Sequence, residues 1–217
     1  MSQPKGPSLR FEKGLEFGYD KPLAKFTDEV ELNGGTHFLL ARNGRGKTTL
    51  LRTVAGTLKT LQGSFTQQGF MQYLPEDMRF DAEITPATIF RMLIPGKRLK
   101  DAMELAERIE LDVKKQFGKL STGNRRKTNL IAAEFSVRQG EGNILLLDEP
   151  FSGLDAFARA TFEEIWKESS DEVLRLVSCH PDYDNMLMPS ALLIEGQTAH
   201  HLKSGDQTWN TLKNQLN

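Results

Sequence analysis

The sequence predicts an α/β fold in a single domain, residues 1–217, with a parallel sheet, further short strands in the opening third and a helical subdomain in the middle. Three observations support this. The opening third alternates short apolar runs with turn signals such as Asn33-Gly34-Gly35, which is typical of short strands. From Thr85 the apolar spacing becomes helical. In the last third, strand-like and helix-like segments alternate, which favours a parallel sheet.

Short apolar segments in the opening third predict strands. They are Leu9–Phe11, Leu15–Phe17, Val30–Leu32, Thr36–Leu40, Gly63–Phe65 and Gly69–Leu74. Residues Thr48–Ala55 have helical spacing and precede Gly56, a residue that commonly ends helices. We therefore expect a strand, a loop and a helix in succession over residues 36–55.

The middle of the chain predicts a helical subdomain over roughly residues 80–137. Thr85 followed by Pro86 is a sound helix start, because proline suits the first helical position. Further helices are predicted at Leu99–Ile109 and Ser121–Val137, and the expected subdomain core contains Phe80, Ile89, Phe90 and Met92. The last third predicts strands Asn143–Leu147 and Val173–Val177, a helix Phe157–Ser169 and a short helix in the tail Lys203–Asn217.

The composition gives no sign of a nucleic-acid partner. The 28 Lys and Arg residues balance 29 Asp and Glu residues, and the net charge of −1 gives no overall attraction to nucleic acid or anionic lipid. Cys179 is the only cysteine, so an intrachain disulfide is impossible, which fits a reducing cytoplasm. The first residues lack the apolar core of a signal peptide, and the aliphatic runs are shorter than the about 20 residues of a membrane span. We therefore expect any membrane part to come from another chain.

Residues Ala41–Thr48 nearly match the phosphate-loop pattern of glycine, four residues and Gly-Lys-Ser/Thr. Phosphate oxygens need several converging donors, and glycine lets backbone N–H groups turn inward without a side chain in the way. The helix that follows adds its positive dipole end. We expect Lys47 to reach the β- and γ-phosphates and the Thr48 hydroxyl to bind Mg²⁺. The predicted nucleotide-binding loop comprises Ala41, Arg42, Asn43, Gly44, Arg45, Gly46, Lys47, Thr48 and Thr49.

Ala41 stands where the pattern has its first glycine. In a left-handed conformation alanine would cost about 1–2 kcal/mol, whereas in extended geometry it would cost little. The alternative for the whole segment is a surface turn that is merely rich in Gly and Arg. The apolar strand Phe38–Leu40 before the loop and the amphipathic helix after it favour the nucleotide site.

A second acidic motif follows an aliphatic strand: Asn143–Leu147 leads into Asp148-Glu149-Pro150. Parallel sheets bind ligands at the carboxyl ends of their strands. We expect Asp148 to hold Mg²⁺, and Glu149, which should point to the opposite side of the strand, to polarise the attacking water as a general base. The alternative is a strand that ends in solvated acids.

Together these motifs resemble the ATP-binding cassette (ABC) ATPase family. Leu120–Lys127 looks like the family's Leu-Ser-Gly-Gly-Gln signature followed by basic residues, Phe151–Asp155 is similar to its D-loop, and Val177–His180 looks like its switch-histidine strand end. The motifs follow in the family's order. The resemblance implies the ABC ATPase fold, a P-loop NTPase sheet with an antiparallel β part and an inserted helical subdomain.

The resemblance also implies ATP and Mg²⁺ as cofactors and assigns roles to further residues. Two such domains pair head to tail in the family, so Ser121 and the N–H of Gly123 would contact the γ-phosphate held by a second copy. His180 would contact the γ-phosphate, and Asp155 would lie across the dimer interface. Tyr19 is placed to stack on adenine, with Phe17 as a fallback and a plain core tyrosine as the alternative.

Besides Ala41, three further positions depart from the family pattern. Thr122 replaces the first signature glycine, and Asn124 replaces the signature glutamine. The Q-loop glutamine falls at Glu76, which can still ligate Mg²⁺ or bind the attacking water but adds negative charge. The basic run Arg125–Lys127 is expected to form a solvated helix face rather than an RNA-binding one, and His200-His201 to be a surface pair.

The predicted function is ATP binding and hydrolysis by the nucleotide-binding subunit of an ABC transporter, which drives transport through a separate integral membrane subunit. We expect a homodimer, peripheral on the cytoplasmic face of the cell membrane. Two alternatives stay open. One is a soluble ABC ATPase that acts on another assembly. The other is a nucleotide-gated binding module with weak hydrolysis, which the residues at 41, 76, 122 and 124 motivate.

Overall fold

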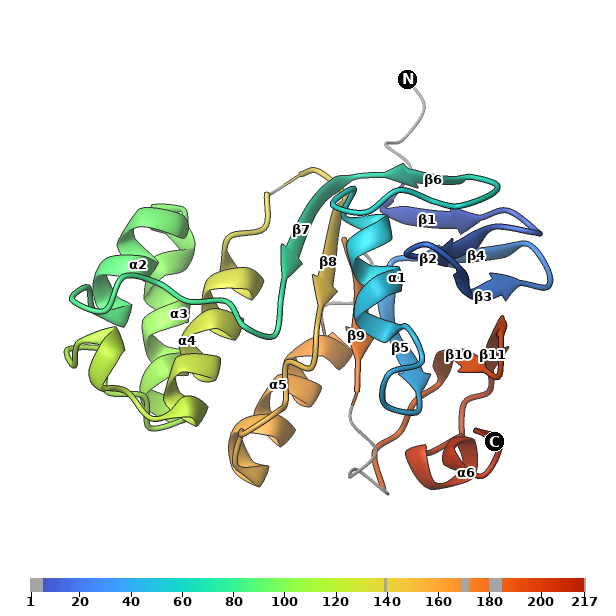
Figure 1. Ribbon diagram of the computed structural model, residues 1–217. Coiled ribbons are helices and arrows are strands. Elements are labelled where there is room, and N and C mark those ends of the chain that lie inside the picture. Colours follow the sequence, from blue (N-terminus) through green and yellow to red (C-terminus); the bar gives the residue numbers. More distant parts are fainter. Residues whose placement is uncertain (1–5, 139, 169–171, 180–184, 217) are drawn as a thin grey trace.

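The computed structural model describes residues 6–138, 140–168, 172–179 and 185–216. Figure 1 shows a large curved sheet beside a small antiparallel one. The eight-stranded sheet has the order β2 (Glu16–Gly18), β3 (Pro22–Phe26), β11 (Thr198–Lys203), β10 (Ser190–Glu195), β5 (Gly35–Ala41), β9 (Val173–Ser178), β8 (Asn143–Leu147) and β7 (Phe70–Leu74). The three-stranded sheet has the order β4 (Val30–Asn33), β1 (Ser8–Phe11) and β6 (Phe65–Gln68). From β10 across to β7 the strands run parallel, so the predicted α/β class is confirmed.

Three of the helices form a separate group beside the large sheet, and the others connect its strands or follow the last one. Figure 1 shows α2 (Pro86–Leu93), α3 (Gly96–Arg108) and α4 (Thr122–Phe135) gathered on one side, with a short 3₁₀ turn, Phe117–Lys119, before α4. The remaining helices are α1 (Lys47–Val54), α5 (Ala156–Glu168) and α6 (Trp209–Lys213). Thr85 caps α2 and accepts a hydrogen bond from the backbone of Thr88, as the sequence predicts. Within the described ranges, no helix has the length and apolar character needed to cross a bilayer.

The central strands separate two buried apolar clusters. Along β8, Leu145 and Leu147 belong to the cluster that also includes α2–α5 residues, whereas Ile144 and Leu146 belong to the cluster beneath α1 and the small sheet. This alternation follows from the two-residue period of a strand. Every residue of β8 is buried, so the acids that follow it emerge directly at the carboxyl edge of the sheet.

A buried ion pair ties α4 to the sheet. The Glu134 carboxylate of α4 accepts hydrogen bonds from Arg175 of β9, at 2.8 Å from Nη2, and from Nε1 of Trp166 on α5, at 2.7 Å. The Arg175 and Glu134 side chains are only 2 % and 3 % exposed. Such a pair depends on both partners, because a lone charge at this depth is strongly unfavourable. The second half of α4 is therefore fixed to β9 and α5.

Several sequence predictions need correction. The sequence analysis did not predict the strands β3, β10 and β11, which are neighbours in the large sheet. Met92 is 74 % exposed, so it does not belong to the subdomain core, although Ile89 and Phe90 do. Arg126 and Lys127 are buried, so the basic run is not a solvated helix face. Helical periodicity in the sequence could not reveal which polar side chains a neighbouring loop covers.

Candidate active site

The loop between β5 and α1 forms a backbone cradle. Gly44 and Gly46 have φ values of 74° and 105°, in the left-handed region that glycine tolerates. At Gly46 a side chain would also be crowded, because an added Cβ would lie 3.2 Å from Cε2 of the buried Phe17. This glycine therefore lets the loop turn directly over the core, with the start of α1 facing outward.

Lys47 is nearly buried at the start of α1. Its Nζ lies 3.2 Å from Oε1 of Glu149 and donates to the carbonyl oxygen of Ala41 at 3.3 Å. Ala41 is the last residue of β5 and pairs with Ile194 in the parallel sheet. Ala41, which replaces the first glycine of the phosphate-loop pattern, thus has an extended backbone, where alanine causes no strain. Its carbonyl helps to hold the lysine amine over the loop.

Asp148 is almost fully enclosed and has three side-chain donors. Its Oδ1 accepts from the hydroxyl groups of Thr48 at 3.2 Å and Ser178 at 2.8 Å, and its Oδ2 accepts from Tyr73 at 3.3 Å. Burial and the negative charge of Asp148 raise the pKa of Tyr73 to about 12, so this phenol stays a hydrogen-bond donor. The carboxylate is thereby held beside the Thr48 hydroxyl.

Glu149 has an unusual backbone conformation, with φ at 47°. A residue with a side chain in this region costs about 1–2 kcal/mol, and such strain is often found at functional sites. Its N–H donates to Ser178 Oγ at 2.8 Å. The prediction that the two acids point to opposite sides of the strand is wrong, because Glu149 leaves extended geometry and both carboxylates reach the first turn of α1.

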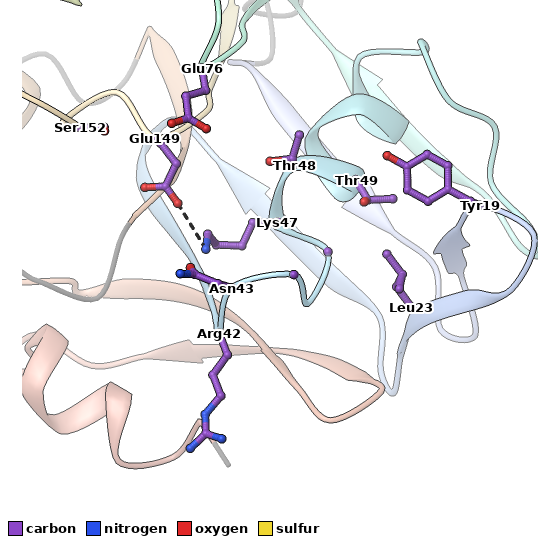
Figure 2. A pocket seen from close by; sticks show the side chains of 12 residues that line it. Tyr19, Leu23, Arg42, Asn43, Lys47, Thr48, Thr49, Glu76, Glu149 and Ser152 are labelled. Atoms are coloured by element: carbon purple, nitrogen blue, oxygen red, sulfur yellow. Dashed lines mark ion pairs between the residues drawn. The ribbon is translucent and has the colours of Figure 1, made fainter. Parts of the chain in front are cut away.

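A cavity of about 580 Å³ opens over these groups (Figure 2). Tyr19 is 54 % exposed at its rim, so the alternative of a core tyrosine is wrong, while Phe17 is buried beneath the loop. Leu23 and Ser152 also line the cavity, although sequence reasoning did not select them. Residues from four chain segments form the wall: Tyr19, Leu23, Arg42, Asn43, Gly44, Gly46, Lys47, Thr48, Thr49, Glu76, Glu149 and Ser152.

Other predicted site residues lie away from this wall. Ala41 and Arg45 belong to the loop without lining the cavity. Ser121 caps α4 and accepts from the backbone N–H of Asn124 at 3.2 Å. Gly123 approaches the loop after β8 so closely that an added Cβ would lie 2.6 Å from the carbonyl oxygen of Gly153. His180 lies outside the described residues.

Asp155 contacts α4 of its own chain. Its Oδ2 lies 2.7 Å from Nζ of Lys127 on α4, and its Oδ1 accepts from the N–H of Ala158 at 2.8 Å. The lysine and this backbone donor lower the pKa of the Asp155 carboxyl group. The acidic loop after β8 is therefore connected both to α4 and to the start of α5.

The donors at the loop fit Mg²⁺ bound together with a phosphate chain. The Thr48 hydroxyl and the Asp148 carboxylate are hard oxygen ligands in direct contact. Magnesium is commonly held by one or two such protein groups plus substrate phosphates, rather than by a complete protein cage. In line with this, the described part of the chain has no group of three or more His, Cys, Asp or Glu residues arranged to hold a metal.

Comparisons with known proteins identify the family of the chain. A family model described as "ABC transporter" matches residues 30–152. The manganese transport system ATP-binding protein MntB of Listeria monocytogenes is 28 % identical over 198 residues, covering 79 % of both chains. An uncharacterised ABC transporter ATP-binding protein of Methanocaldococcus jannaschii is 28 % identical, over 92 % of this chain and 79 % of the relative. The solved ATP-binding ABC transporter protein from Pyrococcus furiosus is 25 % identical and has a TM-score of 0.62, covering 77 % of this chain and 90 % of that one.

Proposed function

This chain belongs to the ABC transporter family and is an ATP-binding, ATP-hydrolysing subunit that drives transport through a membrane partner; from that premise we propose which residues do the chemistry. The observation that carries the proposal is a convergence at one edge of the sheet. The first turn of α1 meets both acids after β8, with Lys47 on Glu149 and Thr48 on Asp148. A phosphate-binding lysine and two carboxylates at one point are the parts that phosphoryl transfer requires.

The cradle holds the phosphates. Backbone N–H groups of residues 43–48, the dipole of α1 and the Lys47 amine supply the positive field. Tyr19 at the rim provides the aromatic face for adenine, and Arg42, Asn43 and Thr49 complete the wall. The cavity, at about 580 Å³, lies within the 300–1,000 Å³ typical of small-ligand sites.

Hydrolysis needs a base and a stabilised charge. Glu149 is 12 % exposed, stands next to Lys47 and faces the cavity, so it is the proposed base for the attacking water. Thr48 and Asp148 would hold Mg²⁺, with Glu76 as a further oxygen ligand. When bound, this ion neutralises charge on the β- and γ-phosphate oxygens. His180 keeps its proposed role beside the γ-phosphate, on the family resemblance alone.

A second copy of the chain completes the site in this proposal. Ser121 lies at the N-terminus of α4, a helix of 14 residues, and is exposed rather than directed into the chain's own cavity. An exposed helix N-terminus is suited to an anion. We propose a head-to-tail homodimer in which Ser121 and Gly123 cover the γ-phosphate of the partner and Asp155 lies near the interface. The site would then close only when both copies hold ATP.

The place of the chain in the cell follows from its role. It works with a membrane permease, and ATP is supplied in the cytoplasm. We propose that it is peripheral on the cytoplasmic face of the membrane. Residues 1–217 act as one ATPase domain, with the helical group of α2–α4 as its subdomain.

Glu149→Gln tests the assignment of the base. The amide keeps the size of the carboxylate but accepts no proton, so the variant should bind MgATP and lose at least about 100-fold in steady-state hydrolysis, the usual worth of a general base. A stable dimer should accumulate with ATP and be seen by size-exclusion chromatography. Wild-type turnover in this variant would show that Glu149 is not the base. Wild-type chain that binds ATP but hydrolyses little, even with its permease, would favour a nucleotide-gated module.

A further inference from the structure

Arg126 is a buried cation on α4. It is 7 % exposed, and its Nη1 is buried without a hydrogen-bond partner. The neighbouring cations on the same helix are accounted for. Lys127 pairs with Asp155 at 2.7 Å, and Arg125 donates to the carbonyl oxygen of Gly118 at 2.6 Å. A buried charge is costly unless opposite charge lies nearby, so the surroundings of Arg126 require an explanation.

The α4 face that carries Arg126 lies against the segment after β7. Asn129, three residues further along the helix, donates from Nδ2 to the carbonyl oxygen of Met78 at 3.0 Å. Residues three apart share one helix face. Arg126 therefore faces the stretch that contains Glu76 and Asp77, just before Met78.

The charges around Arg126 are those of the active site. Burial lowers the pKa of Arg126, and four acids act in the opposite direction: Glu76 first, then Asp148, Glu149 and Asp77. Three of these acids are in the site described above or line its cavity. The Arg126 side chain, on the helical subdomain, therefore lies within electrostatic range of the acids at the site.

Glu76 is the exposed acid among the three at the site. Glu149 is paired with Lys47, and Asp148 has Thr48, Ser178 and Tyr73. Among the residues that the structure describes, Glu76 takes part in no ion pair. A third carboxylate at the cavity would repel phosphate unless its charge is balanced.

We propose that Arg126 is the positioning residue for Glu76: its guanidinium group balances the Glu76 carboxylate and keeps it from repelling the bound phosphates. The inference rests on the proposed nucleotide site. It explains how an acid can stand where the family resemblance places glutamine, because a cation on the facing helix offsets the added charge. It also means that a cation on α4 offsets the charge of an acid at the nucleotide site of the same chain.

A double-mutant cycle with Glu76→Gln and Arg126→Gln tests the pairing, with mant-ATP and Mg²⁺ as the probe. Arg126→Gln should weaken mant-ATP binding about tenfold when Glu76 is present, because the Glu76 charge would then oppose the phosphates without compensation. In the Glu76→Gln background, Arg126→Gln should weaken mant-ATP binding by less than about threefold. Arg126→Lys should stay close to wild type. Arg91→Gln, which removes an exposed arginine from α2, should have no effect.

Urea unfolding without added nucleotide tests the same pair independently. Glu76→Gln should lower the unfolding midpoint of the wild type, since it leaves Arg126 with less opposite charge. It should not lower the midpoint of Arg126→Gln. Should Arg126→Gln fail to fold, Glu76→Gln alone decides, and an unchanged midpoint overturns the proposal.

The two measurements separate the possible failures. If wild-type protein binds no mant-ATP, the proposed function fails, while the urea result still decides on the pair. If Arg126→Gln weakens binding by the same factor in both Glu76 backgrounds, the two residues act independently. The positioning role is then wrong even though the nucleotide site stands.

Discussion

The Nζ of Lys47 lies 3.2 Å from Oε1 of Glu149, so the cation assigned to the phosphates and the acid assigned to the attacking water are direct partners. The two side chains are 8 % and 12 % exposed. At this depth each charge depends strongly on the other. The two residues should nevertheless give different results on mutation: loss of Lys47 should weaken MgATP binding, whereas Glu149→Gln should bind MgATP and lose hydrolysis.

Replacing Lys47 by alanine should weaken MgATP binding by at least about 100-fold, because the main phosphate donor is lost and two buried acids remain without it. Titration with mant-ATP measures this. Lys59→Ala, at an exposed lysine, serves as the matched control. A dissociation constant for Lys47→Ala close to that of the control would exclude Lys47 as a phosphate contact.

Gly46→Ala should destabilise the chain more than Gly44→Ala. Both glycines have left-handed φ, which costs alanine about 1 kcal/mol or more. At Gly44 an added Cβ meets nothing within 4 Å, whereas at Gly46 it lies 3.2 Å from Phe17. The free energies of unfolding from urea titrations of the two variants give the difference. Equal losses would mean that the loop moves freely away from Phe17.

Ser178→Ala should lower stability by about 1–3 kcal/mol and raise the Mg²⁺ concentration needed for half-maximal ATPase activity. The buried hydroxyl both donates to Asp148 and accepts from the N–H of Glu149, each at 2.8 Å. Without it the Asp148 carboxylate loses one of the groups that orient it beside Thr48. Ser204→Ala, at an exposed position, is the control. An unchanged Mg²⁺ dependence would limit Ser178 to a structural role.

His37 should make the protein less stable in acid. Burial, together with the charges of His201 and Lys203, lowers its pKa to about 4, although Nε2 donates to the carbonyl oxygen of Asn33 at 2.7 Å. Since Nε2 carries the proton, Nδ1 must accept from the Ser190 hydroxyl at 2.6 Å, and Ser190 in turn accepts from His201 at 2.7 Å. Protonation of His37 would break this chain of hydrogen bonds.

The sign follows from comparing the two states. The unfolded histidine has a pKa near 6.5, so between this value and about 4 the unfolded chain binds more protons than the folded one. The contribution of neutral His37 to the free energy of unfolding is fully present above pH 6.5 and should fall by up to about 3 kcal/mol as the pH decreases to 4. Urea titrations across this range should show a shallower fall for His37→Gln, and no change in slope for His200→Gln. Parallel curves for wild type and His37→Gln would rule out the contribution.

Much of the active site could be predicted because its motifs are local in sequence. The cradle of residues 41–48, the strand Asn143–Leu147 and the two acids lie where the sequence places them. What could not be predicted depends on contacts across the fold. Ser178 reaches Asp148 from the neighbouring strand, and the left-handed turn at Glu149 brings both acids to one side.

The same distinction explains the errors in the basic run and the histidine pair. Arg126 and Lys127 have the spacing of an ordinary polar helix face, but both are buried, and Lys127 contacts Asp155 and the carbonyl oxygen of Ile109. The half-buried His201 ring hydrogen-bonds to Ser190 of β10 and contacts the ring of His37 on β5, so it is not the surface residue that the sequence indicated. β11 itself carries polar residues at an outer part of the sheet, where alternation of apolar residues is weak.

The Glu134–Arg175 ion pair gives α4 a fixed point. Ser121 lies 13 residues before Glu134, or about 20 Å along a helix that rises 1.5 Å per residue. A tilt of about 5° around that anchor would carry the serine end through about 2 Å, close to the difference between a formed and a broken hydrogen bond. The position of Ser121 is therefore sensitive to the orientation that this buried ion pair gives to α4.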